Sequence, residues 1–178
     1  MRNPIAPSVR DLVSGVLCPV MHSRAEEFAE RAREEHGVEI DVEEFPEGTK
    51  TAADAADALG CDVAQIASSI VFIADAETVV VVTSGANRVS ESKLAGILRV
   101  DESAVRMGDP DEIRERVGWS IGGVPPFCHD GDVRTYLDET LLDHDTVWAA
   151  AGTPETVFPI DPERLRSIVE ADAVDVAE

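Results

Sequence analysis

Hydrophobic and polar residues recur along this chain with two different periods, and the period changes from one segment to the next. Between residues 23 and 37 the apolar positions follow a helical spacing at Ala25, Phe28, Ala29 and Ala32. Ser23 and Glu26 have the spacing of a capping box, and Gly37 is a typical helix end. The pattern therefore predicts a helix that begins at Ser23. The next segment, "VEIDVEEF" over residues 38–45, alternates and predicts a half-buried strand.

The middle of the chain predicts two short helices and a hairpin. Thr51-x-x-Asp54 opens a capped helix that ends at Gly60, and Asp62-x-x-Gln65 opens another that we expect to end at Ser68-Ser69. The runs "SIVFIA" and "TVVVVTS" are rich in β-branched residues and are separated only by "DAE". They predict a hairpin near the middle of a sheet.

Helical and extended patterns continue toward the C-terminus. Helices are predicted over residues 90–98 and 109–118 and from Asp161-Pro162 onward, and "VRTYLD", "TVWAAAG" and "TVFPI" predict three strands. Strands outnumber helices and often follow one another directly. We therefore expect an α+β fold with a mixed, curled sheet: one domain over residues 23–178, preceded by a proline-containing extension over residues 1–22.

Charge composition indicates the environment of the protein. The formal net charge is -21, and lysine occurs only at Lys50 and Lys93, so nearly all the basic residues are arginine. An acidic chain with little lysine is typical of halophilic archaea, whose proteins work in concentrated salt. A disordered acidic chain is excluded because the charges are interleaved with periodic apolar residues.

The same charge limits the partners that we expect. Phosphate contacts dominate nucleic-acid affinity, so the raw charge disfavours DNA. At about 1 M salt the Debye length falls to about 3 Å, which leaves an RNA substrate open. No apolar run is long enough to cross a membrane, and Cys18, Cys61 and Cys128 form no CxxC pair. We expect a cytoplasmic protein with free thiols and no membrane partner.

The stretch "SIGGVPPFCH" over residues 120–129 has the least ordinary composition in the chain. Glycine allows backbone conformations that other residues avoid, and proline fixes φ, so the shape of this loop is closely specified. One interpretation is a turn between a helix and a strand. The other is a rigid wall whose glycine N–H groups approach a ligand.

Other candidate groups have weaker support. Adjacent residues of an extended segment point in opposite directions, which disfavours a Cys128–His129 nucleophilic pair. No recurring ligand spacing supports a metal at His129, Asp130 and Asp132, and we expect His22, His36 and His144 at the surface. Ser68 and Ser69 are either backbone-satisfied hydroxyls or polar groups of a site. GxSxG, Walker, GxGxxG and HExxH motifs are absent.

Two stretches together resemble the YbaK/EbsC family of aminoacyl-tRNA editing domains, which occur free-standing and within bacterial prolyl-tRNA synthetases. They are "TAADAADALGCDVAQIASSIVFIAD" and "GWSIGGVPPFCH", and the resemblance extends from Ser23 to Val176. It implies a barrel-like sheet and trans-editing hydrolysis of mischarged aminoacyl-tRNA without a cofactor or metal. The implied partners are the acceptor end of tRNA and an aminoacyl-tRNA synthetase.

The resemblance also implies a site. The family's Gly-x-x-x-Pro loop corresponds to Gly122 through Pro126, where it would shape a small amino-acid pocket. An aminoacyl ester is already activated, so a positioned water, the ribose hydroxyl or a substrate thiol can cleave it. The implied catalytic residues are Ser68, Gly122, Gly123 and Pro126, and the implied substrate contacts are Thr51, Ser69, Val124, Pro125, Phe127 and His129.

Two positions depart from the family pattern. Ser68 stands where the family has a functional lysine, and Cys128 stands where it has glycine. Serine cannot replace a cation, so Lys50, Arg88 and Lys93 are candidate substitutes. Two other functions therefore stay open: a non-catalytic module that binds a tRNA acceptor end or a synthetase, and a hydrolase of a small ester or nucleotide that uses Cys128 or His129.

Overall fold

A computed structural model describes residues 19–45 and 51–178, with the side chains of residues 19–22 left out. Its strands are β1 (Glu43–Glu44), β2 (Ile66–Ala74), β3 (Glu77–Ser84), β4 (Val105–Met107), β5 (Val133–Asp138), β6 (Val147–Ala150), β7 (Thr156–Ile160) and β8 (Asp172–Val174). Its α-helices are α2 (Pro19–His36), α3 (Ala52–Leu59), α4 (Glu91–Leu98), α5 (Pro110–Val117) and α6 (Pro162–Val169). Single 3₁₀ turns occur at η1 (Val63–Gln65), η2 (Glu102–Ala104) and η3 (Glu139–Asp143).

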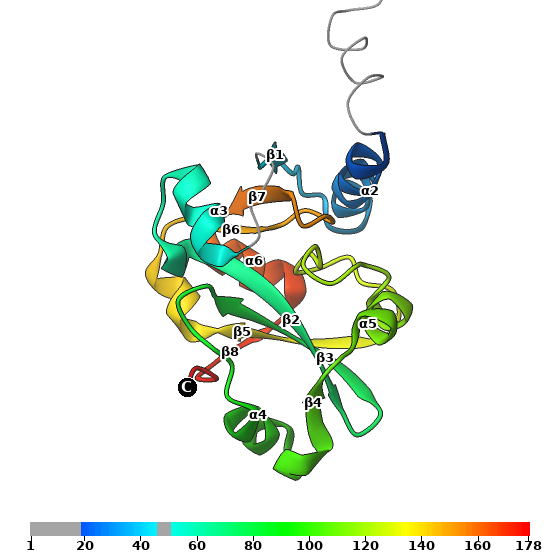
Figure 1. The fold of residues 1–178 in the computed structure, drawn as a ribbon, viewed down its shortest axis with the longest axis vertical. Helices are drawn as coiled ribbons and strands as arrows, with labels where there is room; N and C mark the ends of the chain where they lie inside the picture. Colours follow the sequence, from blue (N-terminus) through cyan, green and yellow to red (C-terminus); the bar gives the residue numbers. More distant parts are fainter. Residues whose placement is uncertain (1–18, 46–50) are drawn as a thin grey trace, which may run out of the picture.

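The strands form one mixed sheet in the order β1-β7-β6-β2-β3-β5-β8, with β4 paired to β2 off this path (Figure 1). The hairpin of β2 and β3 is antiparallel and lies at the centre, whereas β3–β5, β5–β8 and β2–β6 are parallel pairs. In Figure 1, α2 lies beside β7 at one end of the molecule and α4 lies at the other. The predicted α+β fold with a mixed, curled sheet is confirmed.

Local capping signals account for most helix boundaries. Thr51 and Asp54 form the predicted capping box of α3, and Asp109 and Glu112 form that of α5. Gly60 and Gly118 end these helices in the left-handed conformation, which glycine adopts without a side-chain clash. Each of these helices therefore begins and ends where its own residues satisfy the free backbone groups.

Three sequence-based expectations about the elements are wrong. Helix α2 is already helical at Pro19, so Ser23 lies inside it and does not cap it. The strand expected over 38–45 is reduced to the exposed pair Glu43–Glu44. The helix expected to end at Ser68-Ser69 is the single turn η1, and both serines belong to β2. In addition, the sequence patterns do not predict strands β4 and β8. Residues 1–18 lie outside the description, so the extension proposed over 1–22 stays a prediction.

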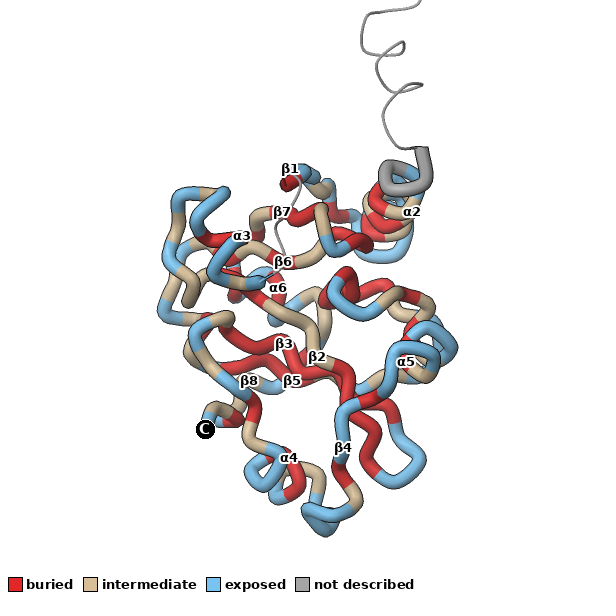
Figure 2. The backbone as a smooth tube through the Cα atoms, in the orientation of Figure 1, coloured by how far each residue is buried: buried red, intermediate tan, exposed pale blue. Residues whose placement is uncertain are grey.

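Both faces of β3 are buried after Glu77, whereas residues 68–70 of β2 are half-buried (Figure 2). On one face Phe28 of α2 contacts Phe127 and Phe158, with ring centroids 5.2 and 5.3 Å away. On the other face Leu94 of α4 packs in a second cluster with Val79 and Val81. Covering both faces explains the unbroken valine run of β3, because no position faces water. No helix among the described residues is long and apolar enough to cross a membrane.

Candidate functional site

A cleft of about 280 Å³ opens along the middle of β2. Its walls come from distant parts of the chain: β2, the 120–129 loop, β6, β7 and the start of α3. The residues that line it include Ser68, Ser69, Gly122, Val124, Trp148 and Ala150. Among the described residues, none of those that line the cleft carries a charge. The described part of the chain therefore offers backbone groups and hydroxyls to a ligand in the cleft.

The pairing of β2 leaves one strand edge open at this cleft. Along that edge β2 pairs with β6 at Ile66 and Ala67 and with β4 from Phe72 onward, and no named strand pairs with residues 68–71 between them. The amide of Gly85 bonds to Ile66 O on the β3 side, and the amide of Gly108 bonds to Val71 O on the open side. Backbone groups alternate between the edges of a strand. Ser69 therefore directs its N–H and C=O toward the open edge, as Val71 does.

The two serines of β2 differ in their surroundings. The Ser69 Oγ is buried and has no hydrogen-bond partner among the described residues. An unsatisfied buried hydroxyl costs about 1–3 kcal/mol, so it is an unusual group to find in a folded chain. Ser68 lies on the opposite face of the strand and borders both this cleft and a second cavity.

The 120–129 loop presents only part of itself to the cleft. Gly122 has φ +86° and lines the cleft together with Val124. Gly123 instead packs against the chain: a Cβ placed there would lie 2.6 Å from backbone atoms of Thr153. Its glycine is required by a close approach of two loops, and a bulky residue there would move the loop as a whole.

Ile121 also lines the cleft, whereas the loop residues from Pro125 onward do not. Pro125 and Pro126 are buried, and Phe127 packs into the core against Phe28 and Phe158. His129 Nε2 lies 2.7 Å from the Pro125 carbonyl oxygen, and burial lowers the pKa of this imidazole. Of the ten predicted site residues, the structure brings together Thr51, Ser68, Ser69, Gly122 and Val124 at the cleft.

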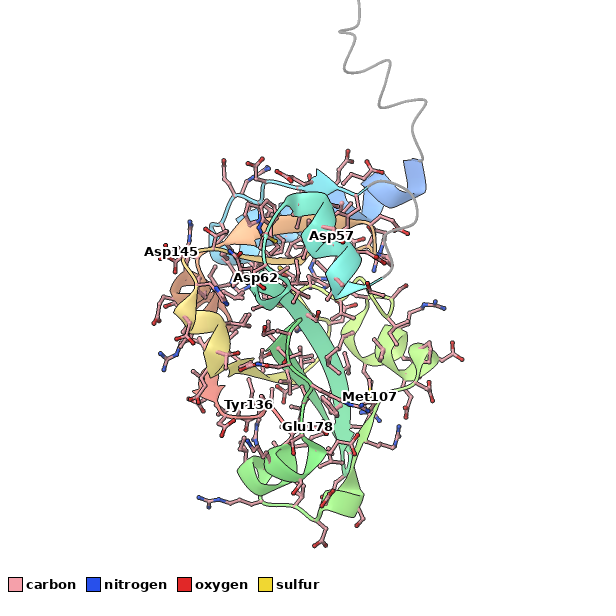
Figure 3. The ribbon with its side chains drawn as sticks, turned by 60° about the vertical axis from the view of Figure 1, so that its left-hand side comes forward. Asp57, Asp62, Met107, Tyr136, Asp145 and Glu178 are labelled. Atoms are coloured by element: carbon pink, nitrogen blue, oxygen red, sulfur yellow. The ribbon has the colours of Figure 1, made fainter. Side chains whose placement is uncertain are left out.

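A second cavity of about 620 Å³ adjoins the cleft and shares Ala52, Ser68, Ile70 and Met107 with it. Met107 and Glu178, labelled in Figure 3, both border this cavity. Of the described residues, Arg88 is the one basic residue that lines either space, and Glu91, Glu102 and Glu178 line the same cavity as Arg88. The cavity therefore combines one cation with three carboxylates and several hydroxyl groups.

The other two candidate cations have different positions. Lys93 Nζ lies 3.0 Å from Asp175 Oδ1 and donates to the Ala177 carbonyl oxygen, so it anchors the C-terminal segment. Lys50 lies outside the described residues. Arg88 is therefore the described candidate at the cavities.

The thiol at Cys128 is unsuited to nucleophilic attack in this structure. Burial raises its pKa to about 12, and the nearby Glu35 carboxylate acts in the same direction. A thiol of that pKa is protonated near neutrality, and the thiolate is the reactive form. Cys128 has φ +64°, so it is not in the extended conformation that we expected. Cys61 and Cys128 are both free, and Cys18 lies outside the description.

Among the described residues, one group of histidine, cysteine and acidic side chains could bind a metal ion. It is not the group of His129, Asp130 and Asp132 that the sequence suggested. Glu35, His36 and Cys128 bring their ligand atoms within 4.8 Å of one another, whereas Asp130 and Asp132 are not part of the cluster. His36 is exposed, as predicted, but its ring lies close to the side chains of Glu35 and Cys128. His144 is half-buried and belongs to no such cluster, and the side chain of His22 is outside the description.

Sequence reasoning missed the cleft walls from Trp148, Ala150 and Thr156. Their strands were predicted, but no local signal says that β6 lies next to β2. It also missed Asp138, a fully buried carboxylate that accepts bonds from Thr83, Ser84, Asn87 and Thr140. Asp138 is the last residue of β5, and an acidic residue at the end of a strand is normally exposed.

Comparisons with known proteins point to one family. The family model described as "Aminoacyl-tRNA editing domain" matches residues 46–168. The uncharacterized protein YwhH of Bacillus subtilis (strain 168) is 30% identical over 127 residues, which cover 71% of this chain and 80% of YwhH. The proline--tRNA ligase of Lactobacillus johnsonii (strain CNCM I-12250 / La1 / NCC 533) is 38% identical over 111 residues, covering 62% of this chain but only 19% of the ligase.

A solved structure agrees with these matches. The crystal structure of a proposed trans-editing enzyme for prolyl tRNA synthetase superposes with a TM-score of 0.80 at 36% sequence identity. The superposition covers 86% of this chain and 97% of that one. Nearly the whole of that protein is therefore similar to the part of the chain described above.

Proposed function

Since the chain belongs to the aminoacyl-tRNA editing domain family, we propose that it is a deacylase that hydrolyses the ester of mischarged aminoacyl-tRNA in trans. The observation that carries the proposal is the uncharged cleft on β2. It lies within the part of the chain that matches the family, and it sets Gly122 and Val124 beside Ser68 and Ser69. Relatives named for prolyl-tRNA synthetase make proline tRNA carrying the wrong amino acid the first substrate to test.

The open edge of β2 supplies the groups that ester hydrolysis needs. A water adds to the carbonyl carbon, the bond to the ribose oxygen breaks, and the ribose oxygen takes the proton that the water loses. Negative charge develops on the carbonyl oxygen in between. The Ser69 N–H, directed to the open edge, is placed to donate to that oxygen, and such a fixed donor typically contributes about 10²–10³ in kcat.

None of the described side chains that line the cleft is charged, so none of them is a ready acceptor for the proton. We assign the proton transfer to the substrate, through the neighbouring ribose hydroxyl or the amino group of the ester. Orientation then contributes much of the rate, as it does when reacting groups are held in place. The buried Ser69 Oγ gains a partner when it binds the substrate amino group or hydroxyl.

The size of the cleft favours small side chains. A space of about 280 Å³ holds the aminoacyl group together with part of the ribose, so alanine, serine or cysteine fits better than a large residue. The adjoining cavity then takes the terminal adenosine, and Arg88 is the cation that meets a phosphate there. Ser68 contributes a hydroxyl at the junction, where it is a weaker group than a lysine.

One observation favours the non-catalytic alternative, a module that binds the acceptor end. The described lining of the cleft holds neither an acid nor a base, and Ser68 brings no cation to it. Binding of charged tRNA with an unchanged ester lifetime would identify that function.

The test is a variant that narrows the cleft. Ala150 is half-buried on β6 and lines the cleft, so Ala150→Phe fills it while keeping a residue suited to a strand. We expect deacylation of proline tRNA charged with alanine to fall by more than about tenfold, in line with lost near-attack geometry. The control is Ala173→Phe on β8, which is half-buried away from the cleft. Equal rates in both variants at equal thermal stability would contradict this assignment of the cleft.

A further inference from the structure

Three side chains of metal-ligating type meet on the side of the 120–129 loop that faces away from the cleft. Glu35 and His36 occupy the last turn of α2, and Cys128 ends the loop on the other side. The carboxylate oxygen, imidazole nitrogen and thiol sulfur all lie within 4.8 Å of one another. In the sequence Cys128 is more than ninety residues from the other two, so the fold creates this cluster.

The donor set matches one kind of ion. Thiolate sulfur, imidazole nitrogen and carboxylate oxygen are the ligands of Zn²⁺, at about 2.0–2.3 Å in tetrahedral geometry. Tetrahedral donors at such distances lie about 3.3–3.8 Å apart, so small side-chain rotations bring these three into range. Glu35 and His36 are exposed, which leaves space for such rotations. A cavity of about 250 Å³ at the same three residues leaves room for a fourth ligand.

Neighbouring contacts already hold the three ligands in place. The Cys128 carbonyl accepts a bond of 2.9 Å from the Trp119 indole N–H, which holds the backbone of this buried residue. Arg31 Nε donates to Glu35 Oε1 at 3.3 Å, and its Nη1 donates to Asp130 at 3.1 Å. The His36 ring lies edge-on to Phe127 with centroids 5.3 Å apart. Such outer contacts orient ligands at metal sites.

The backbone at Cys128 is an independent observation. Cysteine rarely adopts a left-handed conformation, yet Cys128 has φ +64°. Glycine would take this conformation without strain, so the side chain is present at an energetic cost. A role for the thiol itself accounts for that cost.

We propose that Glu35, His36 and Cys128 form a Zn²⁺ site that fastens the end of the 120–129 loop to the C-terminus of α2. The fourth ligand is water or a group from the cavity, where Glu170 is also found. Gly122 and Val124 of the same loop line the cleft, so the ion braces the cleft wall from behind. The site does not depend on the deacylase function.

The charges around the site act in both directions. Arg31 repels a cation, but its guanidinium is shared between Glu35 and Asp130. Glu170 and the half-buried His129 line the same cavity. The net charge of -21 also attracts cations without selectivity, so a test must separate this cluster from the acidic surface.

Calorimetric titration of the reduced full-length protein with Zn²⁺, in molar KCl with millimolar Mg²⁺, makes that separation. We expect one ion per chain, a higher melting temperature with Zn²⁺, and a thiolate-to-metal charge-transfer band when Co²⁺ replaces Zn²⁺. Removal of one ligand side chain should weaken the affinity for Zn²⁺ at least about tenfold. Removing even a residue that only orients a ligand typically weakens metal affinity by about 10–100-fold.

Matched variants test each ligand. Cys128→Gly suits the left-handed backbone, and it should fold while losing the Co²⁺ band and the Zn²⁺ stabilisation. His36→Gln should weaken binding as well. The control is Cys61→Ser, which removes the other described thiol and should bind as the parent does. Unchanged affinity in Cys128→Gly, or no stoichiometric binding by the parent, overturns the proposal.

Discussion

Ser69 combines two properties that usually exclude each other: its hydroxyl is buried, and it has no partner among the described residues. A structural role predicts that its removal destabilises the fold, whereas a substrate role predicts the opposite. We expect Ser69→Ala to leave the free energy of unfolding unchanged or raise it by up to about 1 kcal/mol. The rate of deacylation should fall about three- to tenfold, which corresponds to the loss of one hydrogen bond to the substrate.

Chemical denaturation and single-turnover deacylation measure the two effects. Ser103→Ala is the control, because Ser103 is exposed in η2 and lies away from the cleft. A loss of more than about 1 kcal/mol in Ser69→Ala would show that the hydroxyl supports the fold, and would contradict its assignment to the substrate.

Gly123 illustrates a residue whose role is packing. A Cβ there meets the backbone of Thr153 at 2.6 Å, and backbone cannot rotate away. We expect Gly123→Ala to destabilise the protein by about 1–3 kcal/mol, as overpacking does. Gly96→Ala provides the contrast, because a Cβ at that helical position meets nothing within 4 Å and alanine favours helices. Thermal melts in which Gly123→Ala matched Gly96→Ala would refute this close approach.

Asp138, the last residue of β5, is hydrogen-bonded to the end of β3. Its buried carboxylate accepts from Thr83 Oγ1 at 3.1 Å and from the Ser84 amide at 3.2 Å, and Asn87 and Thr140 add further bonds. Burial alone would raise the pKa of Asp138, but these hydrogen bonds outweigh it and the pKa is lowered. The charged form is thus favoured in the folded state.

The sign of the pH dependence follows from the lowered pKa. A carboxylate with a depressed pKa in the folded state stabilises the fold above its unfolded pKa of about 3.9, and this contribution is lost as the pH falls through the folded value. Asp138→Asn should cost about 1–3 kcal/mol at pH 7, with the gap to the parent shrinking toward acid pH. Urea unfolding across pH 3–7 measures it, with exposed Asp111→Asn as control. A gap that widens in acid would contradict the lowered pKa.

The elements also show what a sequence can predict. The caps at Thr51, Asp109 and Asp161 are local patterns, and the helices begin where those residues place them. Strands β1, β4 and β8 are two or three residues long and exist through partners far along the chain, so no local period marks them. The cleft is similar: five predicted residues reach it, but Trp148 and Ala150 join them only because β6 pairs with β2.

For the whole molecule, the net charge of -21 makes the fold dependent on salt. Like charges repel across the surface at low ionic strength, and at about 1 M salt the Debye length of about 3 Å removes most of this repulsion. We expect the melting temperature to rise steadily between 0.1 and 2 M KCl and to rise equally in NaCl, because screening depends on ionic strength. A melting temperature that falls with salt would contradict electrostatic control of stability.

The activity that we propose for this chain is cleavage of the ester of a mischarged tRNA in the cleft on β2. The most direct test follows the amount of ester-linked amino acid on a panel of correctly and incorrectly charged tRNAs, in molar KCl, with and without the protein. We predict accelerated loss from proline tRNA carrying a small amino acid, and none from tRNA carrying its correct residue. Binding of the same tRNAs by folded protein with no acceleration across the panel would contradict the claim and identify a binding module instead.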